Sequence, residues 1–194
     1  SNTYIGFEAG KGGTGNNSYN TAVGKGALLS ITSGGQNSVL GQNAGDALTT
    51  GQLNCIIGQS AGSVSTDVGF AVIIGVDAGN GALTAAADGT IAIGYTALAA
   101  LTSGAENIAV GYQAGDSINT GAGNTVIGYN AFATATSENS NVVIGGEAGK
   151  SIRHDASDNN VFIGRQASIG GTGGRADNVA IGYKAWGNDG NTND

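Results

Sequence analysis

The sequence predicts an all-β protein, a parallel β-solenoid of about eleven coils, and three regularities support this prediction. An aliphatic residue followed by glycine recurs every 17 to 19 residues along the whole chain. An alanine stands three residues after each of these glycines, and an asparagine stands four residues before most of them. The recurring glycines are Gly6, Gly24, Gly41, Gly58, Gly75, Gly94, Gly111, Gly128, Gly145, Gly164 and Gly182. Such a period is typical of one structural unit that stacks on copies of itself.

Each repeat contains one short apolar run between turn-forming residues. The run is three or four residues long and rich in Val and Ile, which favours a strand and is too short for a helix. We expect each repeat to form one coil, with coils stacked at about 4.8 Å and a rod core on the order of 50 Å long. The pattern predicts a single domain over residues 1–187, followed by a polar C-terminal tail over 188–194.

The recurring positions have different expected roles. Glycine allows a bend that a side chain would block, and alanine suits a tight corner. Side-chain amides repeated at coil spacing predict a hydrogen-bonded ladder along the rod, which only Ala71 and Thr90 interrupt. The asparagines of this ladder are Asn2, Asn20, Asn37, Asn54, Asn107, Asn124, Asn141, Asn160 and Asn178.

Both faces of the expected strands are apolar, which predicts that both are covered. Because side chains alternate along a strand, the residues one and three before each glycine share a face, which we expect to fill the coil. Cys55 belongs to this expected inner face as a small buried thiol. The residues between them would then form an outward apolar stripe that needs a partner surface, most simply another copy of the chain, which predicts a homo-oligomer. The expected interface between the copies contains Val39, Ile56, Ile73, Val126, Val143 and Phe162.

Composition and charge exclude several classes of protein. Glycine supplies 37 of the 194 residues, yet 40% of the chain is hydrophobic, which disfavours disorder. The formal net charge of -7 disfavours nucleic-acid binding, which normally uses a basic face. One cysteine excludes a disulfide framework, and the acidic residues share no column, so we expect no bound metal and no cofactor. No apolar run is long enough to insert into a membrane, and the start without methionine or signal sequence suggests a fragment or processed piece.

Several segments carry the repeat most clearly. They read NTAVGKGA (20–27), NIAVGYQAG (107–115), NTVIGYNAF (124–132) and NVAIGYKAW (178–186). They resemble the head repeats of trimeric autotransporter adhesins and, still more closely, the repeats of phage tail-fibre proteins. The resemblance implies a homotrimer of parallel, left-handed β-rolls that forms the head or shaft of a fibre and attaches to a host surface. The present repeat is longer than the adhesin unit, and its extra residues lengthen a loop.

Two groups of residues are candidates for receptor binding. Tyr95, Tyr112 and Tyr129 follow the motif glycine in three consecutive repeats, which predicts an aromatic ladder that contacts sugar rings or only packs coil on coil. The second group, Arg153, His154, Arg175 and Trp186, lies in the charged and lengthened C-terminal repeats. Long loops of solenoids often form the binding face, although a solvated fibre end fits the same residues.

These observations predict a non-catalytic, extracellular protein. We expect a structural and receptor-binding segment of a trimeric surface fibre, a phage tail fibre or bacterial adhesin head, whose partner is a host cell-surface glycan or an outer-membrane receptor. The alternative is a single-chain solenoid that binds ice or cleaves surface polysaccharide. Cleavage would need paired carboxylates in a groove, and Asp155 with Asp158 is the nearest pair.

Overall fold

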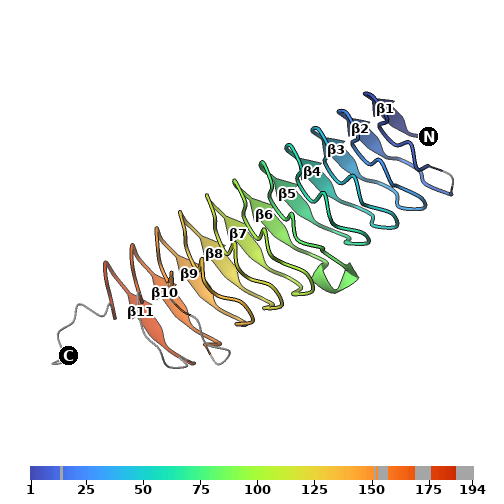
Figure 1. Ribbon diagram of the computed structural model, residues 1–194. Coiled ribbons are helices and arrows are strands. Elements are labelled where there is room, and N and C mark those ends of the chain that lie inside the picture. Colours follow the sequence, from blue (N-terminus) through green and yellow to red (C-terminus); the bar gives the residue numbers. More distant parts are fainter. Residues whose placement is uncertain (14, 151, 153–156, 169–175, 187–194) are drawn as a thin grey trace.

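The computed structural model is an all-β rod in which the chain winds into a stack of coils (Figure 1). The structure describes residues 1–13, 15–150, 152, 157–168 and 176–186. The strands are β1 (Thr3–Ile5), β2 (Thr21–Val23), β3 (Ser38–Leu40), β4 (Cys55–Ile57), β5 (Val72–Ile74), β6 (Ile91–Ile93), β7 (Ile108–Val110), β8 (Thr125–Ile127), β9 (Val142–Ile144), β10 (Val161–Ile163) and β11 (Val179–Ile181). They form one parallel sheet in sequence order, which confirms the predicted solenoid.

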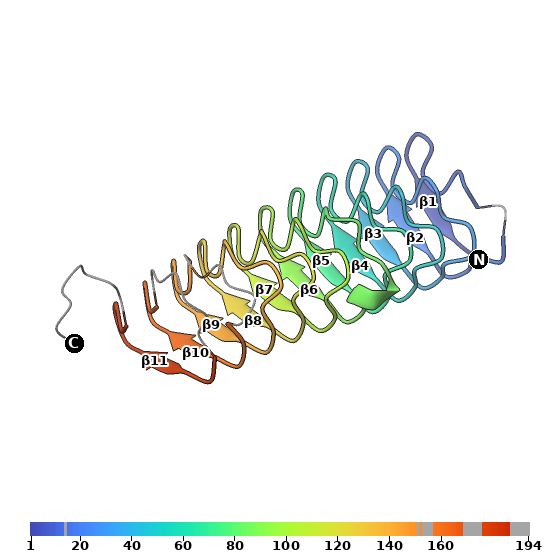
Figure 2. The same ribbon diagram turned by 60° about the horizontal axis from the view of Figure 1, so that its bottom comes forward.

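Neighbouring strands keep the same register from one end of the sheet to the other. Thr3 pairs with Thr21 in the first step, and Val161 pairs with Val179 in the last. Equivalent residues of successive repeats therefore lie in columns along the rod, and the turned view shows the strands as one row (Figure 2). Since each column repeats at about 4.8 Å, its side chains can contact one another from coil to coil.

The side-chain orientation expected from the sequence is wrong. The central residue of each strand points into the coil, and the residues before and after it point outward, so Cys55 is half-buried on the outer face. The six residues expected at a trimer interface are only 0–3% exposed within one chain: Val39, Ile56, Ile73, Val126, Val143 and Phe162. The physical reason is the narrow coil interior. Alanines and larger apolar side chains from the turns also point inward, which leaves room for one strand residue per coil.

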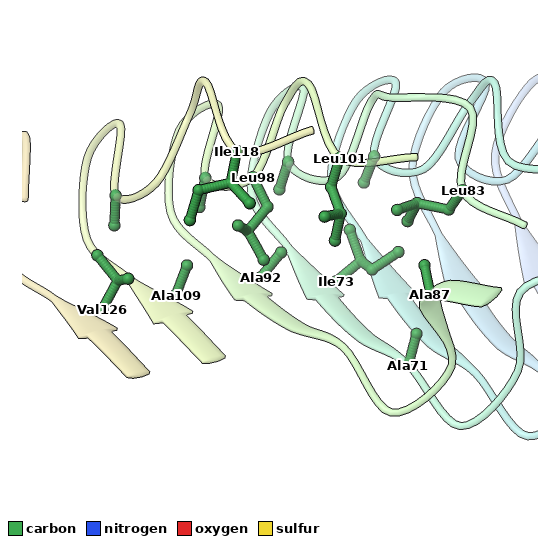
Figure 3. Close-up of a cluster of buried hydrophobic side chains, with 14 of the residues drawn as sticks. Ala71, Ile73, Leu83, Ala87, Ala92, Leu98, Leu101, Ala109, Ile118 and Val126 are labelled. Atoms are coloured by element: carbon green, nitrogen blue, oxygen red, sulfur yellow. The ribbon is translucent and has the colours of Figure 1, made fainter. Parts of the chain in front are cut away.

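Side chains of compensating size fill the coil interior. In one coil the small central strand residue Ala92 is combined with the large Leu98 four positions after the motif glycine, and both are fully buried. Where the strand residue is large, as at Ile73, the later position is Gly79, and a Cβ there would lie 3.2 Å from an Ile73 side-chain carbon. Figure 3 shows Ala92, Leu98 and Ile73 in the same buried cluster. Close packing therefore couples two positions of the repeat.

Each coil turns through left-handed backbone corners at fixed positions. Residues two and four after the motif glycine have positive φ, as do most residues five before it, for example Asn43 at 54°, Gly45 at 55° and Gln36 at 60°. Glycine and asparagine adopt this conformation at low cost, whereas β-branched residues do so at a penalty. The residue types found in the turns are thus determined by the left-handed backbone conformation at the corners as well as by solvent exposure.

Thr96 occupies one of these corners unfavourably. It is β-branched with φ 49°, and its Oγ1 is buried without a hydrogen-bond partner in the described part of the chain. We expect Thr96→Asn to raise the free energy of unfolding by about 1 kcal/mol, because asparagine tolerates the left-handed region. Asn43 and Asn130 already hold the equivalent corner in other coils. Urea denaturation measures the gain, and an equal gain from the exposed control Thr50→Asn would contradict this explanation.

The predicted asparagine ladder is confirmed, and most of it is buried. The Asn37 side-chain nitrogen donates to Asn20 Oδ1 at 3.0 Å and to the Gly51 carbonyl at 3.0 Å. The Asn20 Oδ1 also accepts the Asn37 backbone N–H at 3.0 Å. Side-chain steps of this kind join Asn20–Asn37–Asn54 in one run and Asn107–Asn124–Asn141–Asn160–Asn178 in a second. The ladder therefore supplies partners to backbone groups that the coil buries.

The ladder breaks where the sequence lacks asparagine. The Ala71 backbone N–H donates to Asn54 Oδ1 at 2.9 Å and ends the first run. In the next coil the buried Thr90 hydroxyl donates to the Ala87 carbonyl at 2.7 Å instead. Ala87 ends the short 3-10 helix η1 (Ala85–Ala87), which is the one helix within the described ranges. The altered hydrogen bonding thus coincides with a longer repeat.

Candidate functional site

The outward face of the sheet is a continuous, uncharged and largely apolar surface, which we call the apolar sheet face. It consists of the first and third residues of every strand, and all of these are exposed or half-buried. The first-residue column contains Thr3, Thr21, Ser38, Cys55, Val72, Ile91, Ile108, Thr125, Val142, Val161 and Val179. The third-residue column contains Ile5, Val23, Leu40, Ile57, Ile74, Ile93, Val110, Ile127, Ile144, Ile163 and Ile181. No charged side chain interrupts either column.

The apolar sheet face is unusual for a parallel sheet in a single chain. Parallel sheets normally have both faces covered, and this one is covered only by its own coil. Ile5 is 59% exposed at one end of the rod, Ile57 is 36% exposed between the two ends and Ile181 is 65% exposed at the other end. The prediction that one apolar strand face points outward is therefore confirmed, but the residues predicted to form that face were wrong.

The predicted tyrosine ladder lies beside the apolar sheet face. Tyr95 and Tyr112 stack with ring centroids 5.1 Å apart and an interplanar angle of 18°. Tyr112 and Tyr129 stack at 5.4 Å and 20°. The rings are about half exposed, and their centroid spacing is close to one coil, so the stack runs along the rod. The predicted stacking is thus confirmed, and neighbouring tyrosine rings cover both faces of the Tyr112 ring.

The two ends of the tyrosine ladder differ. The coil before Tyr95 places Val76 in the same column, whereas the coil after Tyr129 places Gly146 there. A Cβ added at Gly146 would meet only the Tyr129 carbonyl oxygen, at 4.0 Å. Arg165 occupies the column one coil further on and is exposed. The aromatic column therefore has an empty position between Tyr129 and Arg165.

Polar side chains lie next to this empty position. The Lys150 Nζ lies 3.0 Å from Glu147 Oε1, and the Gln166 side-chain nitrogen donates to Glu147 Oε2 at 2.8 Å. The Gln166 hydrogen bond is the main cause that lowers the pKa of the Glu147 carboxyl, with added contributions from Lys150 and Arg165. Glu147 is therefore a carboxylate at neutral pH, and both of its oxygens are oriented by neighbouring side chains.

The structure places only part of the second candidate group. Trp186 is 46% exposed and packs edge-on against Phe162, with ring centroids 6.4 Å apart. Arg153, His154 and Arg175 lie outside the described residues, as does the tail 188–194. The described chain therefore brings none of these four together with the tyrosine ladder.

The described residues offer little that resembles a catalytic or metal centre. Among them, no three His, Cys, Asp or Glu side chains gather in a way that could hold a metal ion. Asp158 Oδ1 accepts the Asn139 backbone N–H at 2.7 Å, which gives it a role in joining coils, and Asp155 lies outside the described residues. Within the described ranges, no helix has the length and apolar character needed to cross a bilayer.

Two features of the columns are visible in the sequence but were not predicted from it. The central strand column contains several alanines, and in most coils a large residue there is combined with a small residue four after the motif glycine, which indicates a shared interior. The interruption of the tyrosine column at Gly146 is also visible in the sequence. Its meaning depends on the stacking of the rings, which only the structure provides.

Comparison with known proteins finds no matching protein-family model, no matching curated protein and no matching solved structure.

Proposed function

We propose that this chain is a structural and receptor-binding segment of a trimeric extracellular fibre, of the phage tail-fibre or adhesin-head kind, and is not an enzyme. The observation that carries the proposal is the apolar sheet face, which runs the length of a regular rod without a charged residue. A rod of this kind separates two ends, and an apolar face along its whole length favours side-by-side association with copies of itself.

The size of the apolar sheet face supports association. Eleven strands at about 4.8 Å and three residues at about 3.3 Å give a surface of roughly 500 Å². That area is at the upper end of the largest apolar patch on a typical monomer, about 300–600 Å². Since every copy presents the same face in the same direction, three parallel rods can bury it around a common axis. The polar turns of each coil would then form the outer surface of the fibre.

The tyrosine ladder supports receptor binding by the same fibre. Its rings are half exposed at the edge of the apolar sheet face, where they offer apolar surface with a polar hydroxyl group. A trimer would carry three copies of each ladder, so weak individual contacts with a host surface would combine into avid attachment.

The solution mass of the chain and of a face variant tests this proposal. We expect light scattering with size-exclusion chromatography to give about three times 18.8 kDa for the wild type. The double variant Ile57→Lys, Ile127→Lys should shift the protein to monomer, because it places six charges in the shared core of the trimer. Both side chains are more than a third exposed in the single chain, so the coil itself should tolerate lysine there.

The matched control is Thr50→Lys, which adds a charge at an exposed turn away from the apolar sheet face. It should keep the mass of the wild type. A monomeric wild type would contradict the trimeric fibre. If the wild type is trimeric, binding to a glycan array and to intact host cells follows as the test of attachment.

Ice binding by a single chain is the second candidate, and one observation favours it. The column that contains Thr3, Thr21, Ser38 and Thr125 faces outward, whereas the sequence analysis placed it inside the coil. A flat, regular face of methyl and hydroxyl groups is compatible with an ordered water layer. Thermal hysteresis of a monomeric chain would support this candidate, and a trimer that buries the face would exclude it.

A further inference from the structure

We propose that the empty position over Gly146, between the Tyr129 ring and Arg165, binds one carboxylate-bearing pyranose ring of a surface glycan. We call this position the ladder gap. The inference deepens the proposed function and rests on it, because it names the ligand class and the place of contact of a receptor-binding fibre.

One face of the Tyr129 ring is free at the end of the tyrosine ladder. Tyr112 covers one face of Tyr129, and the stack runs along the rod, so the other face of Tyr129 is directed toward the next coil. That coil presents Gly146, which has no side chain to cover the ring. Tyr129 is accordingly 56% exposed, compared with 45% for Tyr112 and 46% for Tyr95, whose outer neighbour is Val76.

The ladder gap has the size of one sugar ring and is held by backbone hydrogen bonds. Tyr129 and Arg165 are two coils apart, or about 10 Å at the strand spacing. Carbon atoms in contact are about 3.5–4.0 Å apart, so the gap accepts one flat or puckered ring between the two side chains. The Glu147 N–H donates to the Tyr129 carbonyl at 2.7 Å, and the Gln166 N–H donates to the Gly146 carbonyl at 2.9 Å. These bonds fix the three coils relative to one another.

The polar side chains around the ladder gap fit a sugar better than a hydrocarbon. Glu147 is an oriented carboxylate that can accept hydrogen bonds from hydroxyl groups, and Gln166 adds an amide beside it. Apolar ring contact combined with a few placed polar groups is the general composition of small-ligand sites. Tyr129 supplies the apolar contact.

An exposed arginine at the far side of the ladder gap favours an anionic sugar. Arg165 lies in the column one coil beyond Gly146, whereas Lys150 already pairs with Glu147 at 3.0 Å. The guanidinium of Arg165 can bind a carboxylate through two parallel hydrogen bonds and can also lie flat against a ring. A uronic-acid type of pyranose satisfies both requirements.

Saturation-transfer NMR on the full chain tests the ladder gap with two probes, methyl glucuronide and methyl glucoside. The wild type should bind the glucuronide more tightly than the glucoside. Gly146→Tyr should weaken glucuronide binding about tenfold, because a fourth tyrosine fills the gap and replaces the stacking contact. The variant should fold, since four coils already carry tyrosine at this position and Gly146 has an ordinary φ angle. Its circular dichroism and thermal midpoint verify this.

Two further variants complete the design. Gln59→Tyr adds a tyrosine to the same column away from the ladder gap and should bind both probes like the wild type. Arg165→Gln should abolish the preference for glucuronide over glucoside. Unchanged glucuronide binding in a folded Gly146→Tyr variant would overturn the ladder gap, as would the absence of any glucuronide signal from the wild type. Attachment of the wild-type chain to host cells in either of those cases would leave the proposed function intact, whereas a chain that attaches to no cell or glycan contradicts the function itself.

Discussion

Gly94→Ala is expected to lower the free energy of unfolding by about 4 kcal/mol. Gly94 has φ 137°, a conformation that residues with a Cβ rarely adopt. Its added methyl carbon would lie 2.6 Å from the Gly111 carbonyl carbon and closer still to the carbonyl oxygen. The obstructing atoms are backbone, held by the coil on each side, so no side-chain rotation relieves the clash.

Thermal denaturation at fixed protein concentration measures this loss, which corresponds to a fall of roughly 10 °C in the midpoint for a chain of this size. The matched control is Gly146→Ala, where φ is ordinary and the nearest atom to a new Cβ is 4.0 Å away. The control should be neutral or slightly stabilising, because alanine restricts the unfolded chain. Similar midpoints for the two variants would show that the motif glycine is not required by geometry.

Asn124→Ala is the second substitution with a large expected effect. Asn124 donates to Asn107 Oδ1 at 3.0 Å and to the Glu138 carbonyl at 2.8 Å. Its own Oδ1 accepts the backbone N–H of Asn141 at 3.0 Å and the side-chain amide of Asn141 at 3.1 Å. Alanine would leave the buried Asn141 N–H without its acceptor and would remove the side-chain donor to the Glu138 carbonyl, whereas Asn107 Oδ1 would keep the backbone N–H of residue 124. The expected cost is about 3 kcal/mol.

The exposed Asn16 provides the control, since Asn16→Ala removes the same amide from a solvated turn and should change stability by less than about 0.5 kcal/mol. Urea denaturation compares the two variants. Amide hydrogen exchange adds a local test, because protection of the Asn141 N–H should fall in Asn124→Ala while distant coils keep theirs. If Asn124→Ala is as stable as Asn16→Ala, the ladder is a consequence of the fold and does not stabilise it.

Much of the fold could be predicted from the sequence because each sequence repeat corresponds to one coil of the solenoid. The strand at each Ile-Gly step, the parallel order and the asparagine ladder were all predicted, and the structure confirms each of them. The tyrosine ladder was predicted from the same reasoning, because equivalent residues of stacked coils must be neighbours.

The alternation of side chains along the strand could not show which strand residues point into the coil. A strand of three residues alternates only once, so the pattern fits either the middle residue inside or the two outer residues inside. Both options were apolar here, and hydrophobicity alone did not decide between them. The corners of the coil determine which strand residue points inward. They direct residues such as Ala97 and Leu98 into the coil, and the remaining volume fits one strand side chain, Ala92.

The sequence by itself determined the repeat, its strands, its ladders and the existence of an outward apolar face, because each of these depends only on which residues recur at one coil spacing. The tertiary structure alone decided which residues form that face and where the aromatic column is open. Those properties depend on interior volume and on ring stacking across coils. The ladder gap at Gly146 therefore became visible only when Tyr129 and Arg165 were placed on either side of it.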